Sequence, residues 1–411
     1  MISKFYQQLI IFIKSRDTDF FLFTFFYFLN SCFIYAHNFG LNYFLPVEEM
    51  GTYSNLNSIC NLLVSICSLE IYCVYLRFLD SGCNKNLRSQ VNTVLLCAFF
   101  IYATVIFVAF KSFLLLPFFC FSLYRERLYY YRAKLQIVKY GVIQLVFYVI
   151  SILMIITLFS LHILKGYNFI FSQGIIYGIL YLLCICFFRK VKENNRLDDH
   201  CKSKETPLRD LLKYSVPGAV SGLFGWAIGA ADQAFINAHL SVEIQAGFAV
   251  AFRTIGVIRI LAGSFFEFWP RYYVQQIEKK ALISLTKARS LFVLLYILSS
   301  LLMIYFAKFL YLLMGAGKYS GTVWIFQVLM VSEIFRVLGS LNVTYFSYIL
   351  RGYLITIAFG VLGSLKLGAN FFYNENLGVE FFVYSTVFIY VLFFLFSISA
   401  LFAERKHCRV I

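Results

Sequence analysis

Long apolar runs, separated by short polar segments, alternate along the whole chain. A helix needs about 20 mostly apolar residues to cross a bilayer. Twelve runs meet that length: residues 20–42, 51–76, 91–110, 113–131, 141–164, 168–188, 211–238, 245–269, 290–311, 320–347, 353–373 and 380–402. The pattern predicts an all-α integral membrane protein with twelve transmembrane helices, and it leaves no polar stretch long enough for a soluble domain.

The composition supports this prediction and excludes the main alternatives. Of the 411 residues, 61% are hydrophobic, 20% are aromatic and only 14% are charged. A soluble domain carries about 25% charged residues, and a disordered chain has few aromatic ones. The 11 cysteines lie mostly within apolar runs and have no disulfide-like or zinc-like spacing. The basic N-terminus has no small-residue cleavage site, so we expect no removable signal peptide.

The net charge of +16, from 36 basic and 20 acidic residues, is best explained by membrane topology. Lysine and arginine collect in cytoplasmic loops, so a basic membrane protein need not bind nucleic acid. With the N-terminus inside, 28 of the 36 basic residues fall on inward-facing segments, which predicts that both termini are cytoplasmic. The five at outward-facing ends are Lys111, Lys165, Lys308, Lys318 and Lys366. The three that remain within spans are Arg253, Arg259 and Arg336.

The charged stretch before the seventh run divides the chain into two halves of six spans. We predict an N-terminal lobe over 1–195, a cytoplasmic linker over 196–210 and a C-terminal lobe over 211–411. Because six is an even number, both halves enter the membrane in the same direction, as in a parallel repeat. Leu45–Glu48 and Leu240–Glu243 share three of four residues at an offset of 195, which favours a duplication.

Charged residues inside the spans are the main indication of function. On insertion scales each costs about 2.5–3.5 kcal/mol, so they usually face a cavity or a partner. Arg253 and Arg259 share a face of the eighth run, and Asp232 lies in the outer part of the seventh. Glu333 and Arg336 are three residues apart, near enough to pair. These groups either line a hydrophilic pathway or only neutralise one another between helices.

The N-terminal half offers polar residues of its own. One face of the second run carries Ser54, Ser58, Asn61, Ser65 and Ser68. Asn30 and His37 lie seven residues apart, which places both on one face of the first run. In the fourth run Arg125 either snorkels to the interface or reaches a central cavity. The small polar face is explained equally by a pathway or by close helix packing.

The sequence contains no complete motif of a known enzyme class. Gly315-Ala316-Gly317-Lys318 is similar to a phosphate-binding loop, but Leu312 stands where the first glycine belongs and no Ser or Thr follows the lysine. The chain has no metal-ligand cluster of Cys and His. We therefore expect no enzymatic activity, no metal and no cofactor.

The opening of the second half contains a recognisable series of motifs. It begins with Leu211-Leu212-Lys213-Tyr214-Ser215-Val216-Pro217, continues with Asp232-Gln233-Ala234-Phe235-Ile236 and Gly247-Phe248-Ala249-Val250-Ala251, and closes with Phe268-Trp269-Pro270. This series resembles the multidrug/oligosaccharidyl-lipid/polysaccharide (MOP) exporter superfamily and, within it, the O-antigen flippases. The likeness covers residues 208–274, and the charged Arg125-Glu126-Arg127 segment departs from the family pattern.

The resemblance implies a MATE-like fold of two six-helix lobes and a flippase of the bacterial inner membrane. Its cargo would be an oligosaccharide repeat unit on a polyprenyl diphosphate, carried by alternating access for O-antigen or another surface polysaccharide. Membrane lipids, the polysaccharide polymerase and the chain-length machinery are the other expected partners. The residues expected to line the pathway are Arg253, Arg259, Arg336, Arg125, Asn61 and His37. Asp232 and Glu333 are the candidates for coupling to H⁺ or Na⁺.

The sequence alone leaves three other functional hypotheses open. A major-facilitator transporter also has twelve spans, but Leu76 stands where the glycine of its loop motif would be expected. An ion-coupled drug exporter of the same superfamily favours an acidic cavity, whereas this interior offers unpaired arginine. An O-antigen polymerase should have a large external loop, and no outer loop here exceeds about fifteen residues.

Overall fold

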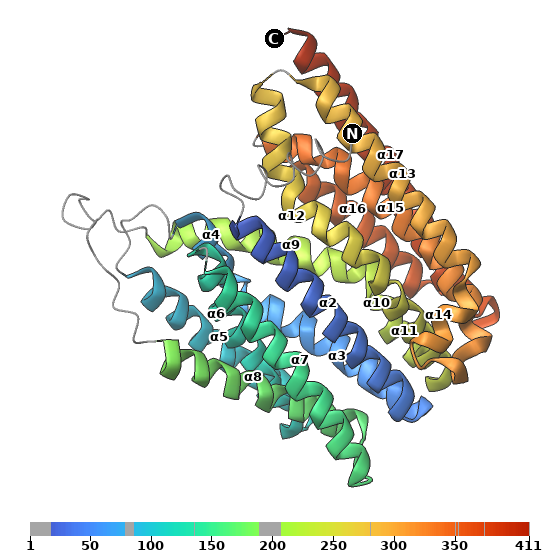
Figure 1. The fold of residues 1–411 in the computed structure, drawn as a ribbon. Coiled ribbons are helices and arrows are strands. Elements are labelled where there is room, and N and C mark those ends of the chain that lie inside the picture. The colour runs from blue at the N-terminus through green and yellow to red at the C-terminus, as the bar shows by residue number, and fades with distance from the viewer. Residues whose placement is uncertain are drawn as a thin grey trace, which may run out of the picture. The chain divides into compact units, whose positions relative to one another are not determined.

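The computed structural model of the chain describes residues 18–78, 86–134, 136–188, 207–279, 281–349, 351, 353–373 and 375–410. Within these ranges the chain is helical apart from short turns, with no strand (Figure 1). The helices of the first half are α2 (Thr18–Phe44), α3 (Val47–Ser68), η1 (Ile71–Val74), α4 (Tyr75–Phe78), α5 (Leu87–Phe110), η2 (Phe113–Phe119), α6 (Cys120–Ala133), α7 (Ile137–Ser160) and α8 (Gly166–Phe188). Those of the second half are α9 (Leu208–Gly229), α10 (Ala231–His239), α11 (Val242–Thr254), α12 (Gly256–Glu278), α13 (Leu282–Tyr305), α14 (Ala307–Leu313), η3 (Gly317–Thr322), α15 (Val323–Tyr348), α16 (Tyr353–Phe371), η4 (Glu375–Leu377) and α17 (Glu380–Val410).

The predicted all-helical class is confirmed, and each predicted apolar run coincides with one or more of these helices. Among the described residues, eight helices are long and apolar enough to cross a membrane. A ninth span is possible if α9 and α10, which meet at an angle of 44° beside Ala230, act together. The full count of twelve and the side on which the termini lie stay predictions.

By contacts between residues the chain forms two compact units. Unit 1 comprises Met1–His37, Cys67–Leu161 and Phe171–Ser215, and unit 2 comprises Asn38–Ile66, His162–Ile170 and Val216–Ile411. Four of the five boundaries fall inside helices, namely α2, α3, α8 and α9, and the fifth lies between α7 and α8. The predicted lobes and the 196–210 linker stay predictions, and residues 196–206 of that linker lie outside the described part of the chain.

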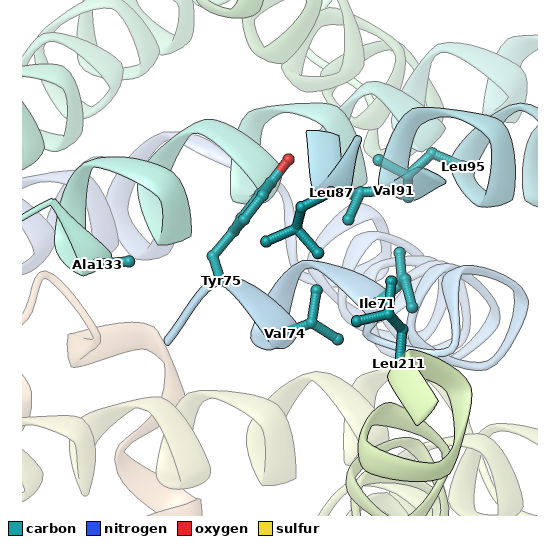
Figure 2. Close-up of a cluster of buried hydrophobic side chains, with 8 residues drawn as sticks. All are labelled: Ile71, Val74, Tyr75, Leu87, Val91, Leu95, Ala133 and Leu211. Carbon is teal, nitrogen blue, oxygen red and sulfur yellow. The ribbon is translucent and has the colours of Figure 1, made fainter. Parts of the chain in front are cut away.

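A cluster of buried side chains joins η1, α4, α5, α6 and α9 within unit 1 (Figure 2). Its members are Ile71, Val74, Tyr75, Leu87, Val91, Leu95, Ala133 and Leu211. The one polar tip in this cluster is satisfied, since the hydroxyl of Tyr75 donates to Oε1 of Glu126 at 2.8 Å. Glu126 is fully buried and is paired with Arg127 at 3.1 Å. Pairing lets α6 keep an acid inside the unit without leaving its charge uncompensated.

Several helices expose apolar faces that a water-soluble protein would bury. On α13 the side chains that are at least half exposed include Leu291, Leu294, Leu295, Leu298, Leu301 and Leu302. The spacing of these leucines follows the helical repeat, so they form one continuous stripe. Contiguous exposed apolar surface of this kind fits contact with lipid rather than water. The structure therefore supports a multi-pass membrane protein.

In unit 2, α15 packs against α17, α13 and α16 (Figure 1). Gly339 on α15 allows close approach, because a Cβ atom there would lie 2.6 Å from the ring of Phe393 on α17. A buried hydrogen bond of 3.0 Å from Asn342 to Ser397 joins the same two helices. This packing fixes the position of α15, which carries Glu333 and Arg336.

A glycine allows an equally close approach in unit 1, and it provides a test of the packing there. A Cβ atom added to Gly174 of α8 would lie 2.4 Å from the main-chain carbon of Pro117 and 2.5 Å from the nitrogen of Phe118. We expect Gly174→Ala to destabilise the protein by about 1–3 kcal/mol, because main-chain atoms of η2 cannot easily move aside. Thermal unfolding of the purified protein in detergent measures this.

The matched control is Gly218→Ala in α9, where an added Cβ atom would meet nothing within 4 Å. Alanine favours a helix over glycine by about 1 kcal/mol, so this variant should be neutral or slightly more stable. Unfolding of Gly174→Ala at the temperature of the unmodified protein would contradict the packing of α8 on η2.

Candidate functional site

Two arginines of unit 2 share one buried carboxylate. Nε of Arg336 donates to Oε2 of Glu333 at 2.8 Å, and Nη2 of Arg259 donates to the same oxygen at 3.1 Å. Glu333 is 1% exposed, whereas Arg259 and Arg336 are 33% and 29% exposed. The expectation of unpaired arginine is therefore wrong for Arg259, whereas Arg336 forms the pair with Glu333 that their spacing allows. With two guanidinium groups for one acid, the cluster keeps one net positive charge.

These two arginines lie on the wall of a cavity of about 250 Å³. Its lining comprises Gly225, Gly229, Ala230, Phe252, Arg259, Arg336 and Tyr390. The glycines of α9 keep one side of the cavity open, since a Cβ atom at Gly225 would meet nothing within 4 Å. The guanidinium of Arg259 lies 4.5 Å from the centroid of the Phe252 ring, which adds a cation–π contact.

Arg253 is held without a carboxylate among the described residues. Its Nη2 donates to the hydroxyl of Ser54 at 2.6 Å, and its Nη1 contacts the sulfur of Met50 at 2.9 Å. The guanidinium carbon of Arg253 lies over the Tyr53 ring, 4.9 Å from the ring centroid. Neutral partners of this kind orient an arginine but leave its charge available to an anion. The α11 helix ends at Thr254, so Arg253 and Arg259 belong to different helices.

Unit 1 contains a second arginine-lined cavity, of about 350 Å³. Its lining comprises Phe121, Tyr124, Arg125, Leu128, Tyr129, Arg132, Tyr140, Gln144, Phe147, Tyr148 and Tyr177. Arg125 is held by Glu70 at 3.4 Å and lies 4.7 Å from the centroid of the Tyr72 ring. The cavity that Arg125 reaches lies within unit 1. A central cavity for Arg125 stays a prediction.

Asn30 and His37 support the wall of this cavity from behind. The amide of Asn30 donates to Oε1 of Gln144 at 3.2 Å. The His37 ring packs edge-on against Tyr148, with 6.0 Å between centroids. Gln144 and Tyr148 both belong to the cavity lining. Asn30 and His37 therefore contact side chains that line the cavity and are not part of the lining themselves.

Part of the polar face of α3 is used for helix packing within unit 2. Ser58 accepts a hydrogen bond of 2.9 Å from the indole of Trp226 and donates to the carbonyl of Ala230 at 3.4 Å. Asn61 donates to the carbonyl of Asn57 on its own helix at 2.7 Å. Ser54, on the same face, accepts a hydrogen bond from Arg253, one of the arginines expected to line the pathway. The linings of the two arginine cavities do not include Asn61.

Asp232 is part of a fully buried ion pair that the sequence did not suggest. Its Oδ2 lies 2.9 Å from Nζ of Lys366, and both side chains are 0% exposed. Lys366 is therefore enclosed within the protein, inside α16, and the side of the membrane that it faces stays a prediction. The available signal was the spacing of Lys366 and Asn370, which places a basic and an amide side chain on one helical face. No group of three or more potential metal ligands occurs among the described residues.

Comparison with known proteins adds information on the fold. No protein-family profile matches the chain, and no curated protein matches it. One similar solved structure is described only as "protein A"; it is 12% identical, covers 93% of this chain and 95% of its own, and has a TM-score of 0.55. Another, "Crystal structure of MATE in the bent conformation", is 13% identical over 94% and 95% of the chains, with a TM-score of 0.49. The likeness to the first shows that a similar helical fold extends over nearly the whole of another solved chain.

The shared carboxylate of Glu333 predicts a specific sensitivity. We expect Glu333→Gln to destabilise the protein by about 2–4 kcal/mol, because two guanidinium groups then lie together without an acid. The expected loss of stability is smaller than for a fully enclosed ion pair, since water partly screens the two arginines. Thermal unfolding in detergent measures the change.

Removing one of the two cations as well should recover part of the loss, so Glu333→Gln combined with Arg336→Met is the test of cause. Glu48→Gln, at an exposed acid of α3, is the matched control and should unfold as the unmodified protein does. If Glu333→Gln and Glu48→Gln behave alike, Glu333 does not hold the arginines together.

Proposed function

We propose that this chain is a non-enzymatic transporter of the MOP superfamily, in the bacterial inner membrane. Within that class we propose a flippase for oligosaccharide repeat units carried on a polyprenyl diphosphate. One observation supports it above others: each unit has its own cavity lined by two arginines and at least one tyrosine. Among the described residues, neither lining contains Asp or Glu.

Arginine suits a diphosphate inside a membrane better than any other side chain. It stays charged in a poorly hydrated site, and its planar fork matches two phosphate oxygens at once. In unit 2, Arg259 and Arg336 are each about one-third exposed towards their surroundings and carry one net positive charge with Glu333. A diphosphate would supply the missing negative charge.

The cavity of unit 1 has the chemistry expected for sugar rings. Besides its two arginines it is lined by five tyrosines: Tyr124, Tyr129, Tyr140, Tyr148 and Tyr177. Aromatic faces can pack against the apolar side of a sugar, while phenol hydroxyls and the amide of Gln144 can bond to its hydroxyl groups. Asn30 fixes Gln144, so this polar group is already oriented.

An apolar groove in unit 2 would accommodate part of the prenyl chain. The groove, of about 720 Å³, is lined by Phe224, Ile357, Gly360, Val361, Ser364, Leu365, Gly368, Ala369 and Phe372. Phe224 of α9 lies in this groove, and the next residue, Gly225, lines the arginine cavity. One helix thus borders both an apolar and a cationic site, as a lipid with an anionic head group requires.

An ion-coupled exporter of small molecules, MATE-like or of the major-facilitator type, is the alternative. A cationic drug would meet arginine in both cavities, which costs interaction energy instead of supplying it. The flippase and the small-molecule exporter would both work by rocking of two lobes. Coupling to H⁺ or Na⁺ is likewise proposed for either function.

Arg253 lies outside the two cavity linings but has no described carboxylate partner, so the proposed arginine pathway predicts a large effect there as well. Arg253→Ala should lower translocation of a polyprenyl-diphosphate-linked oligosaccharide at least about tenfold, since a hydrogen bond to a charged group contributes about 1.5–3 kcal/mol. The amount of the Arg253→Ala variant in the membrane should equal that of the unmodified protein, because no described carboxylate loses its partner. Arg259→Ala should have a similar effect, and Arg253→Lys should retain part of the activity. The readout is accessibility of the glycan to a lectin outside proteoliposomes.

Arg209→Ala is the matched control, since it removes an exposed arginine at the start of α9. Surface polysaccharide in a complemented deletion strain provides the cellular readout. Normal polysaccharide with both Arg253→Ala and Arg259→Ala would refute the arginine-lined pathway. Efflux of cationic dyes without translocation of the lipid-linked glycan would favour the small-molecule exporter.

A further inference from the structure

Asp232 lies at the centre of a closed polar cluster in unit 2. Its Oδ1 accepts from the amide of Asn370 at 2.8 Å, and its Oδ2 accepts from the hydroxyl of Thr386 at 2.8 Å. The same Oδ2 is paired with Nζ of Lys366 at 2.9 Å. The cluster joins α10, α16 and α17, and all four side chains are at most 3% exposed. Bulk water therefore does not reach this acid.

The lysine ammonium within the cluster is surrounded by oxygen atoms of three chemical kinds. Besides the Asp232 carboxylate, it donates to the main-chain carbonyl of Phe382 at 3.1 Å and to the hydroxyl of Ser385. Oδ1 of Asn370 is buried and accepts no hydrogen bond from the described residues, so a further oxygen is present in the cluster. Carboxylate, carbonyl and hydroxyl oxygens are the ligands of hard cations in proteins.

We propose that the Lys366 ammonium is a resident cation, occupying a site that would otherwise bind a monovalent alkali cation. The charge balance of the cluster supports a site for a monovalent cation. Asp232 contributes one negative charge, so one monovalent cation neutralises the cluster, whereas a divalent ion would overcompensate it. Because the lysine is tethered to α16, its ammonium is present at every Na⁺ or K⁺ concentration.

For transport, the consequence is that the Asp232 site does not exchange Na⁺ or K⁺ in this chain. This consequence rests on the proposed function, whereas occupancy of the site is a property of the folded protein alone. The alternative is that the ion pair only clamps three helices together. A clamp and a resident cation differ in one respect, which is whether a free alkali cation can replace the ammonium.

The test uses the purified full-length protein in detergent and requires no transport. Lys366→Ala is prepared in NaCl, exchanged into NaCl, KCl or choline chloride at equal ionic strength, and followed by thermal unfolding. We expect NaCl or KCl to raise its melting temperature above that in choline chloride by at least about 3 °C. The unmodified protein should show no such difference, because its site is filled.

Two controls separate cation binding from general effects of salt or lost packing. Asp232→Asn combined with Lys366→Ala removes the negative charge and should abolish the difference between alkali and choline salts. Lys318→Ala removes a lysine that contacts the main-chain carbonyls of Tyr43 and Leu45, without leaving a paired acid behind. It should not acquire a response to Na⁺ or K⁺.

Three outcomes would overturn the proposal. The first is a folded Lys366→Ala variant that responds equally to all three salts. The second is a variant that does not fold in NaCl or KCl although the double variant does, because an alkali cation then cannot take the place of the ammonium. The third is an unmodified protein that is itself stabilised by Na⁺ or K⁺ through Asp232. Failure of the flippase assay would leave all of these measurements intact, so the two proposals can fail separately.

Discussion

A charge inside a membrane protein is tolerated only where other groups compensate the loss of water, and this constraint organises both units. In unit 1, Glu126 is paired with Arg127 and bonded to Tyr75. In unit 2, Glu333 is bonded to two arginines, and Asp232 has three partners in a closed cluster. Each buried acid also joins helices that are distant in sequence. For Glu333 and Asp232, compensation of charge and assembly of the helices are achieved by the same contacts.

The hydrophobic pattern was sufficient to predict the helical elements, because length and hydropathy are local properties of the chain. The short spacing from Glu333 to Arg336 also predicted their pairing, since residues three apart share one helical face. Both predictions depend on relations within one segment. For the same reason the common face of Asn30 and His37 was recognisable, although the side chains that they contact were not.

Pairings between helices distant in sequence could not be predicted in this way. Asp232 and Lys366 are 134 positions apart, and the charge count assigned Lys366 to an outward-facing end without a partner. Likewise, Glu333 pairs with Arg259 from another helix, so an arginine that the sequence left unpaired shares the acid of Arg336. A lysine and an aspartate both within spans are each too costly alone, and that energy argument is stronger evidence for pairing than loop position.

Exposure follows charge balance across these clusters. Asp232 and Lys366 cancel one another, and both are completely enclosed. Arg259 and Arg336 have one acid between them, and each retains about one-third of its surface. A cluster with a net charge cannot be sealed from water at acceptable cost, so it must face a cavity unless a ligand completes it. The physical condition that keeps the arginine cavity open is therefore the same condition that would make an anion bind there.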